Sequence, residues 1–174
     1  SKYYWKVVST DPSGSITSSI MNFTVAVAPE WSHEFGGTQI PKTAISMDGE
    51  YIFIGVDEGN GNDTFNLFAK DNSTPLWTYT VYSVTIREVA ISADGEYLVA
   101  CTSYVEDGSA KGKIYLFGKD SSTPLWNYTT GGYMRSVSIS ADGEYIAAGS
   151  SDFEYKIYLF DKDSSTPLWN YTTG

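Results

Sequence analysis

A repeated pair of motifs constrains this chain more than any other feature of its sequence. Asp-Gly-Glu-Tyr occurs three times, beginning at residues 48, 94 and 142, and Ser-Thr-Pro-Leu-Trp occurs three times, beginning at 73, 122 and 165. Successive copies of a motif are therefore spaced by between 43 and 49 positions. A period of this length indicates one supersecondary unit repeated along the chain, in which each copy buries its apolar surface against its neighbours.

Each repeat predicts four short antiparallel strands joined by turns. In the last repeat the strands are expected at residues 136–140, 145–149, 156–160 and 168–172. Asp142-Gly143 supplies the positive φ that a tight turn needs between the first two strands. The third strand is apolar on both faces, which predicts a strand covered on both sides. The predicted fold class is therefore all-β, with four-stranded antiparallel sheets packed face to face.

The apolar strand at 113–117 is followed by Trp126-Asn127-Tyr128-Thr129-Thr130-Gly131-Gly132. This pattern resembles the blades of pyrroloquinoline-quinone-like and WD40-like β-propellers over about residues 30–174. The resemblance implies three four-stranded units, at about 29–77, 78–126 and 127–174, plus one orphan outer strand around Trp31. It does not extend to chemistry. The Trp-Asp dipeptide of WD40 repeats is absent, and the vicinal disulfide and Asp–calcium pair of quinone enzymes match no position here.

The segment before the repeats, residues 1–28, follows a different pattern. Two alternating segments, 3–8 and 21–27, flank a turn at 11–14 and read as a β-hairpin. Tyr3 and Trp5 resemble the end of a fibronectin type III domain, in which Tyr3 would be the corner tyrosine. The resemblance implies a C-terminal hairpin of such a sandwich over residues 1–28, followed by a propeller repeat region over residues 29–174.

No set of residues in the sequence suggests catalysis. The Asp and Glu of the Asp-Gly-Glu-Tyr motif recur in every repeat, which indicates turn construction rather than a unique acid and base. His33, the only histidine, aligns with Tyr128 and is expected to be a packing residue. Cys101, the only cysteine, aligns with Gly55 and Gly149 and is expected to fill a small core position. We predict no enzymatic activity, no catalytic residues and no cofactor.

Two loops at equivalent places differ between the repeats. The segment 57–63 is rich in oxygen ligands but lacks the residue order of a calcium loop, so we interpret it as a solvated hairpin and predict no metal site. The segment 107–112 is the second variable loop. Such variation marks either a binding face or tolerance to insertion.

Five N-glycosylation sequons occur in the sequence, where composition predicts roughly two by chance. Two of them are copies of one another, in successive repeats. The asparagines are Asn22, Asn62, Asn72, Asn127 and Asn170. We expect Asn127 and Asn170 on the exposed face of outer strands, where an N-glycan can project.

The net charge and the hydropathy of the chain disfavour some classes of partner. The formal net charge of −10 disfavours nucleic acid, and no apolar run is long enough to span a bilayer. We expect a non-enzymatic, extracellular or cell-surface scaffold that contacts other proteins or further copies of itself, because three blades leave two open apolar faces. The alternatives are a quinoprotein-type propeller enzyme and a sugar-binding module that uses Tyr104 and Phe153.

Overall fold

The computed structural model describes residues 31–35, 41–59, 61–151 and 154–173. The strands in this part of the chain form three four-stranded antiparallel sheets, each built from four consecutive strands. The first sheet contains β1 (Lys42–Ile45), β2 (Tyr51–Asp57), β3 (Asn62–Ala69) and β4 (Trp77–Tyr82). The middle sheet contains β5 (Thr85–Ile91), β6 (Tyr97–Glu106), β7 (Ser109–Gly118) and β8 (Trp126–Thr130). The last sheet contains β9 (Tyr133–Ile139), β10 (Tyr145–Ser151), β11 (Lys156–Asp161) and β12 (Trp169–Thr172).

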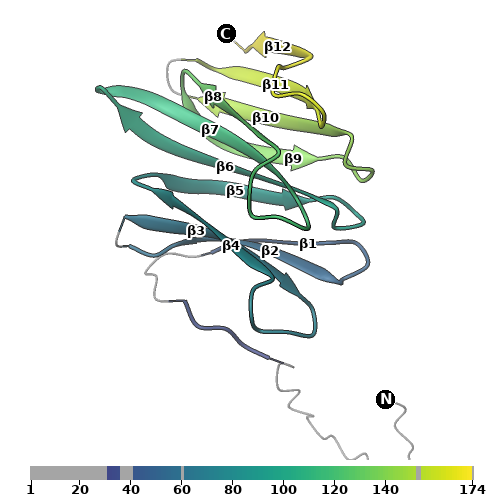
Figure 1. Cartoon of the computed structure of the whole chain (residues 1–174). Coiled ribbons are helices and arrows are strands. Elements are labelled where there is room, and N and C mark those ends of the chain that lie inside the picture. Colours follow the sequence, from purple (N-terminus) through teal and green to yellow (C-terminus); the bar gives the residue numbers. More distant parts are fainter. Residues whose placement is uncertain (1–30, 36–40, 60, 152–153, 174) are drawn as a thin grey trace, which may run out of the picture.

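The three sheets stack face to face in chain order (Figure 1). The first strand of each sheet lies closest to the preceding sheet: β5 contacts β1 and β2, and β9 contacts β5, β6 and β7. Two apolar cores result. The first core lies between the first and middle sheets, and the second core lies between the middle and last sheets.

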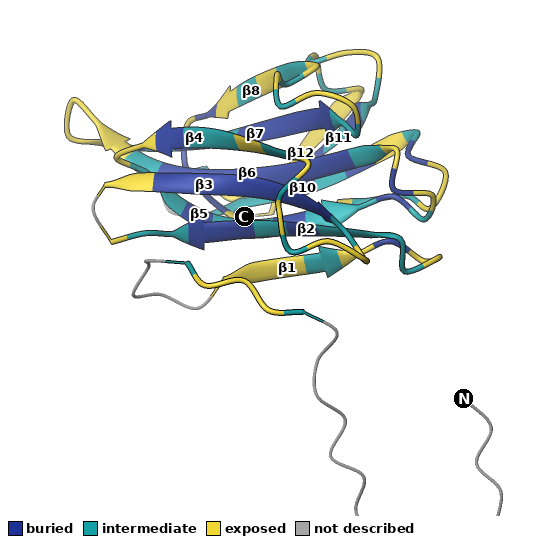
Figure 2. Cartoon of the chain, turned by 60° about the horizontal axis from the view of Figure 1, so that its bottom comes forward, coloured by how far each residue is buried: buried dark blue, intermediate teal, exposed yellow. Residues whose placement is uncertain are grey.

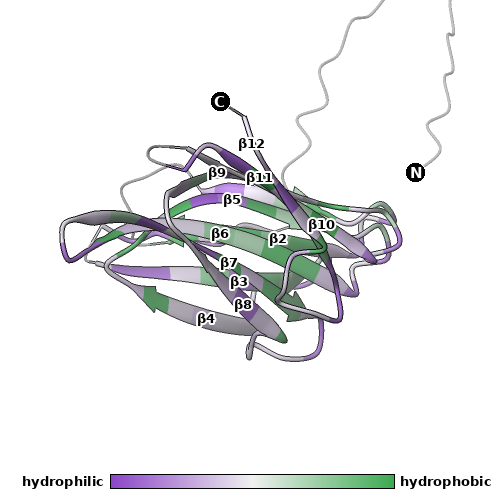
Figure 3. Cartoon of the chain, turned by 90° about the horizontal axis from the view of Figure 1, so that it is seen from above, coloured by the Kyte–Doolittle hydropathy of each residue, from purple (hydrophilic) through white to green (hydrophobic). Residues whose placement is uncertain are grey.

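The middle sheet is covered on both faces. In β7, Tyr115 and Phe117 belong to the first core, while Ile114 and Leu116 belong to the second core. The strands β3, β6 and β7 are mostly buried, whereas β1 is largely exposed (Figure 2). Apolar residues run along β2 and β6 (Figure 3). The predicted burial of the third strand on both sides is confirmed in the middle sheet.

The Asp-Gly-Glu-Tyr motif builds the turn between the first and second strands of each sheet. Its glycines have φ angles of 73°, 74° and 75°. In the last sheet the Ser140 hydroxyl donates a 2.5 Å hydrogen bond to Asp142, which also accepts one from the Glu144 N–H at 3.1 Å. These bonds hold the pKa of Asp142 below its ordinary value, and Asp48 and Asp94 are held low in the same way. The Glu144 side chain pairs with Lys162 after the third strand, as Glu50 does with Lys70 and Glu96 with Lys119.

Two expectations need correction. Residues 31–35 do not form a strand, since no described strand lies beside them to supply a hydrogen-bonded ladder. The repeat units at about 29–77, 78–126 and 127–174 are out of phase with the sheets, because boundaries at Trp77 and Trp126 place β4 and β8 in the following unit. The hairpin expected within residues 1–28 lies outside the described residues.

Candidate functional site

A tryptophan in the last strand of the first sheet, and another in the last strand of the middle sheet, each connect their sheet to the next one. We call this contact between neighbouring sheets a joint. The indole N–H of Trp77 donates a 2.7 Å hydrogen bond to the carbonyl oxygen of Lys119, and that of Trp126 donates one of 2.7 Å to Lys162. Each indole also packs on a phenylalanine of the next sheet: the ring centroids of Trp126 and Phe160 are 5.3 Å apart. The bond fixes the position of the ring while the apolar contact is buried.

Trp31 makes the same joint on the first sheet. Its indole N–H donates to the carbonyl oxygen of Lys70, and its ring stacks on Phe68 with centroids 5.7 Å apart. His33 packs on the same Phe68 ring at 5.3 Å, just as Tyr128 packs on Phe160 at 5.2 Å. Residues 31–35 thus lie against the first sheet where the outer strand of a preceding sheet would lie, although they form no strand themselves.

A second joint is made by the tyrosine of the Asp-Gly-Glu-Tyr motif. Tyr51 lies against Gly95 of the next turn, where a Cβ atom would come within 2.5 Å of the tyrosine ring, and Tyr97 lies against Gly143 in the same way. The backbone completes the joint, because Ala93 donates its N–H to the carbonyl oxygen of Ala141 at 2.9 Å. The motif therefore builds both a turn and a sheet-to-sheet contact.

The outward face of the last sheet carries the same groups without a described partner. We call this surface the end face. Tyr145 is 48% exposed, Ile157 42%, Trp169 50% and Tyr171 66%. The corresponding Tyr97 and Trp126 of the middle sheet are partly buried against the last sheet. The end face is therefore equipped for a joint of the kind seen twice inside the chain.

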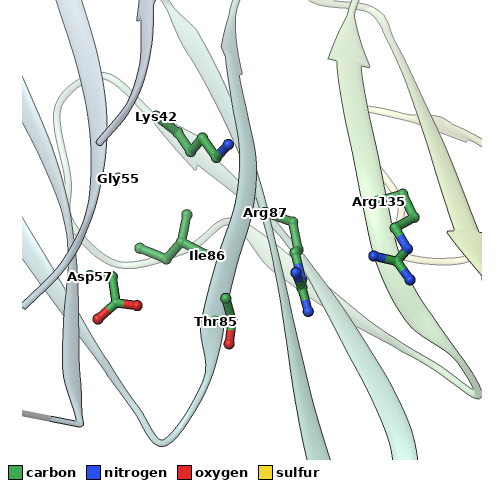
Figure 4. A pocket seen from close by; sticks show the side chains of 7 residues that line it. All are labelled: Lys42, Gly55, Asp57, Thr85, Ile86, Arg87 and Arg135. Carbon is green, nitrogen blue, oxygen red and sulfur yellow. The ribbon is translucent and has the colours of Figure 1, made fainter. Parts of the chain in front are cut away.

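A separate cleft opens beside the innermost strands β1, β5 and β9 (Figure 4). It has a volume of about 420 Å³. It is lined by Lys42, Gly55, Asp57, Thr85, Ile86, Arg87 and Arg135. Three of these residues are cationic and one is acidic, in a chain whose net charge is −10. We call it the cationic cleft.

Strand irregularities place both arginines in the cationic cleft. The pairing of β5 with β6 shifts between Ile86 and Glu88, which leaves Arg87 as an extra residue. The pairing of β9 with β10 shifts in the same way and leaves Arg135 as the extra residue. A bulge of this kind re-aims the side chain that it carries. The two arginines thus occupy equivalent positions in successive sheets.

Comparison with known proteins places the architecture. Residues 122–158 match the WD domain, G-beta repeat family. Among solved structures, the chain is similar to the one titled "Structure of Dos1 propeller", with a TM-score of 0.57 and 15% sequence identity. The similarity covers 78% of this chain and 34% of that one, so this chain spans about a third of its length. The three sheets are blades of a β-propeller. The comparison with curated proteins gives no match, and neither finding above supports a fibronectin type III domain.

The sequons fall at several places in the blades. Asn127 and Asn170 are exposed on β8 and β12, the outer strands of the middle and last blades. Asn62 and Asn72 are exposed in the first blade, where the Asn72 side chain also accepts a 2.9 Å hydrogen bond from the Thr74 N–H and shapes a turn. Asn22 lies outside the described residues. N-glycosylation of these sites stays a prediction.

The cysteine is a core residue, and the histidine is an exposed residue whose ring packs on the first sheet. Cys101 is fully buried in the second core, and burial raises the pKa of its thiol to about 12. The neighbouring repeats have glycine at this position, and a Cβ on Gly55 would come within 2.8 Å of Ile86. The His33 ring contacts Phe68 and the carbonyl oxygen of Ser73, which lies 2.7 Å from Nδ1.

The acidic hairpin of the first blade holds one unusual carboxylate. Asp63 is 2% exposed, and burial together with the nearby charge of Asp57 raises its pKa to about 6. No group of three or more His, Cys, Asp or Glu residues in the described part of the chain is arranged to hold a metal ion. In the other variable region, Tyr104 is partly buried, while Phe153 lies outside the described residues. No helix within the described ranges is long and apolar enough to cross a membrane.

Sequence reasoning missed the two joints and the cationic cleft. The Trp–carbonyl bond ends on the backbone of Lys119 or Lys162, which no side-chain pattern reveals. The recurrence of Trp and of Gly-Glu-Tyr at fixed spacing was the available signal for the joints. The chain has only two arginines, Arg87 and Arg135, and each stands seven positions before the Asp of its repeat's Asp-Gly-Glu-Tyr motif. This shared place in the repeat was the available signal for the cleft.

Proposed function

We propose that this chain is a non-enzymatic scaffold module of an extracellular or cell-surface protein, whose blades dock against further blades of the same repeat. One observation carries the proposal: the end face exposes the Tyr and Trp side chains that both internal blade contacts partly bury. Contiguous apolar patches of more than a few hundred Å² are rare on monomers, and covering them gains about 25 cal/mol per Å².

The contacts between the blades of this chain indicate which groups a blade docked on the end face must supply. Tyr145 needs a glycine in a tight turn, as Gly143 serves Tyr97. The indole N–H of Trp169 needs a backbone carbonyl beside a phenylalanine, as Trp126 has in the last blade. A blade that carries the Asp-Gly-Glu-Tyr motif and a Phe-x-Lys segment supplies both.

The opposite end of the array offers part of the complementary surface. A Cβ on Gly49 would meet nothing within 4 Å, so the place that a tyrosine takes at Gly95 is open at Gly49. Residues 31–35 already cover the outer part of this surface through Trp31 and Lys70. The inner strands of an added blade would lie beside this segment and use it as their outer strand. Contacts of this head-to-tail type close into a ring or propagate into a filament.

The finer resemblances and the compartment belong to the same proposal. The exposed Asn127 and Asn170 support an extracellular location with N-glycans on outer strands. Within the propeller class, the Trp-plus-Gly pattern supports a resemblance to pyrroloquinoline-quinone-like as well as to WD40-like repeats. For residues 1–28 we propose a resemblance to the end of a fibronectin type III domain, on the sequence pattern of Tyr3 and Trp5.

The test is the molar mass of the 174-residue chain by light scattering over a concentration series. We expect the mass to rise with concentration above the 19.1 kDa of one chain. The double variant Tyr145→Ala/Trp169→Ala should remain near that mass. The control Leu125→Ala removes a similarly exposed side chain outside the end face, and should assemble like the unaltered chain. A compact monomer of 19.1 kDa at every concentration would contradict the proposal.

A further inference from the structure

We propose that the cationic cleft is a binding site for a small ligand that carries an oxyanion, a carboxylate or a phosphate group, held between Arg87 and Arg135. This inference is independent of the scaffold function. It rests on where the two arginines lie, on the buried Nε of Arg87 and on the shape of the cleft.

Both arginines of the chain lie in the cationic cleft. The chain contains 11 cationic and 21 acidic residues, and only two of the cations are arginines. Both line the same cleft, one from β5 and the other from β9. Arginine presents a planar fork of N–H donors that matches the two oxygens of a carboxylate or phosphate.

A bulge in β5 and another in β9 direct the two arginines into the cleft. Each arginine is the extra residue of a bulge, so two blades use the same backbone irregularity to aim a guanidinium into the cleft. In Arg135, Nε donates a 2.5 Å hydrogen bond to the hydroxyl of Ser151, which fixes the direction of the guanidinium. In the first blade the β1–β2 pairing ends at Lys42 and Gly55, and Lys42 lines the cleft there.

Arg87 has a buried hydrogen-bond donor. Its Nε is buried and has no hydrogen-bond partner among the described residues. The ion pairs between described residues use Lys70, Lys119, Lys156 and Lys162, and none includes Arg87 or Lys42. A buried donor without a partner destabilises the free protein, and an oxyanion in the cleft removes that cost.

The lining defines the size and polarity of the ligand. A cleft of about 420 Å³ lies in the range of small-molecule sites. Ile86 packs at Gly55 and forms an apolar wall, while Thr85 adds a hydroxyl. Asp57 and Arg135 lie at opposite ends of the lining (Figure 4), so a ligand with its anionic group at the arginine end and a neutral or donor group at the Asp57 end fits best.

The experiment is calorimetric titration of the full chain with inorganic phosphate and, separately, with succinate, at constant ionic strength in chloride buffer. We expect saturable binding of at least one probe. Tighter binding of phosphate identifies a phosphate ligand, and tighter binding of succinate identifies a carboxylate ligand. Arg87→Gln and Arg135→Gln should each weaken the affinity about tenfold or more, because each removes a charge-assisted fork.

Two further variants keep the test decisive. Lys111→Gln makes the same change in charge on the β6–β7 hairpin, outside the cationic cleft, and should leave the affinity within about twofold. Arg135→Lys keeps the charge but loses the fork, and should bind more weakly than the unaltered chain. Since Arg135 is exposed, its variants test the proposal even where Arg87→Gln does not fold. Absence of saturable binding of both probes, or equal weakening by Lys111→Gln, would overturn the proposal.

Discussion

The middle and last blades carry the same pattern of residues but have different surroundings. Ile114 in β7 is fully buried, whereas Ile157 at the same position in β11 is 42% exposed. The tyrosine of the turn motif is partly buried in the middle blade as Tyr97 and 48% exposed in the last blade as Tyr145. The repeat therefore encodes two apolar faces per blade, and burial of the second face depends on the next blade in the stack.

Truncation of the two isoleucines gives the largest expected difference between these blades. Ile114→Ala should lower the free energy of unfolding by about 2–5 kcal/mol, because it removes buried methyl groups and leaves a cavity in the second core. Ile157→Ala should lower it by less than about 1 kcal/mol, mainly through β-propensity. Urea denaturation at concentrations where the chain is monomeric measures both values. Equal losses would mean that the end face is covered within a single chain.

Two turn glycines differ in whether a tyrosine ring covers them, and this gives a smaller expected difference in stability. Gly143 and Gly49 have φ angles of 75° and 73°, so alanine is strained to a similar degree at both, by about 1–2 kcal/mol. At Gly143 a Cβ would also lie 2.5 Å from the Tyr97 ring, while at Gly49 it would meet nothing within 4 Å. Gly143→Ala should therefore destabilise the chain by about 1–3 kcal/mol more than Gly49→Ala in thermal or urea unfolding.

The double variant Gly143→Ala/Tyr97→Ala separates strain from packing. If the clash with the Tyr97 ring causes the extra loss of stability, Gly143→Ala should cost no more in the Tyr97→Ala background than Gly49→Ala costs in the unaltered chain. A loss that persists in the double variant would show that the Tyr97–Gly143 contact does not cause the difference.

The sequence predicts what is local in these blades. The spacing of apolar and turn residues placed the four strands of the last blade, and β9, β10, β11 and β12 confirm them within a few residues. The recurrence of Asp and Glu predicted turn construction, which the Ser140–Asp142 and Lys162–Glu144 contacts confirm. These features depend on neighbours in the chain or within one sheet.

The features that the sequence did not predict depend on contacts between sheets. Trp126 bonds to a backbone carbonyl 36 residues away, and the side chain of Lys162 has no part in that bond. The bulges at Arg87 and Arg135 arise from a register shift in strand pairing, which a period-two pattern does not encode. The strand expected around Trp31 does not form at residues 31–35 for a related reason. A single tryptophan can pack on a neighbouring sheet, but a β-ladder needs a second strand.

One of the buried positions at which the first blade differs from the middle blade gives the smallest predicted effect. Asp63 in β3 stands where the middle blade has Gly112, which lies under Met134 and Thr130. Asp63 is equally covered, at 2% exposure, and its Oδ2 has no hydrogen-bond partner among the described residues. A covered carboxylate beside Asp57 favours its protonated form.

Stability should therefore rise as the pH falls from about 7.5 to about 5, because the pKa of Asp63 is about 6 in the folded chain and 3.8 by its ordinary value. The stabilising contribution is complete below the unfolded pKa and is lost as the pH rises through the folded one. The gain should be roughly 1–2 kcal/mol, seen as an increase of a few degrees in the thermal midpoint.

Asp63→Asn should stabilise the chain near neutral pH and abolish this rise, while Asp57→Asn should reduce it by removing one neighbouring charge. The turn carboxylates Asp48, Asp94 and Asp142 have lowered pKa values, so they oppose the trend only below about pH 4. A midpoint that is constant or falls between these two pH values in the unaltered chain would show that Asp63 is ionised at no cost, and that its position is as tolerant of charge as an exposed one.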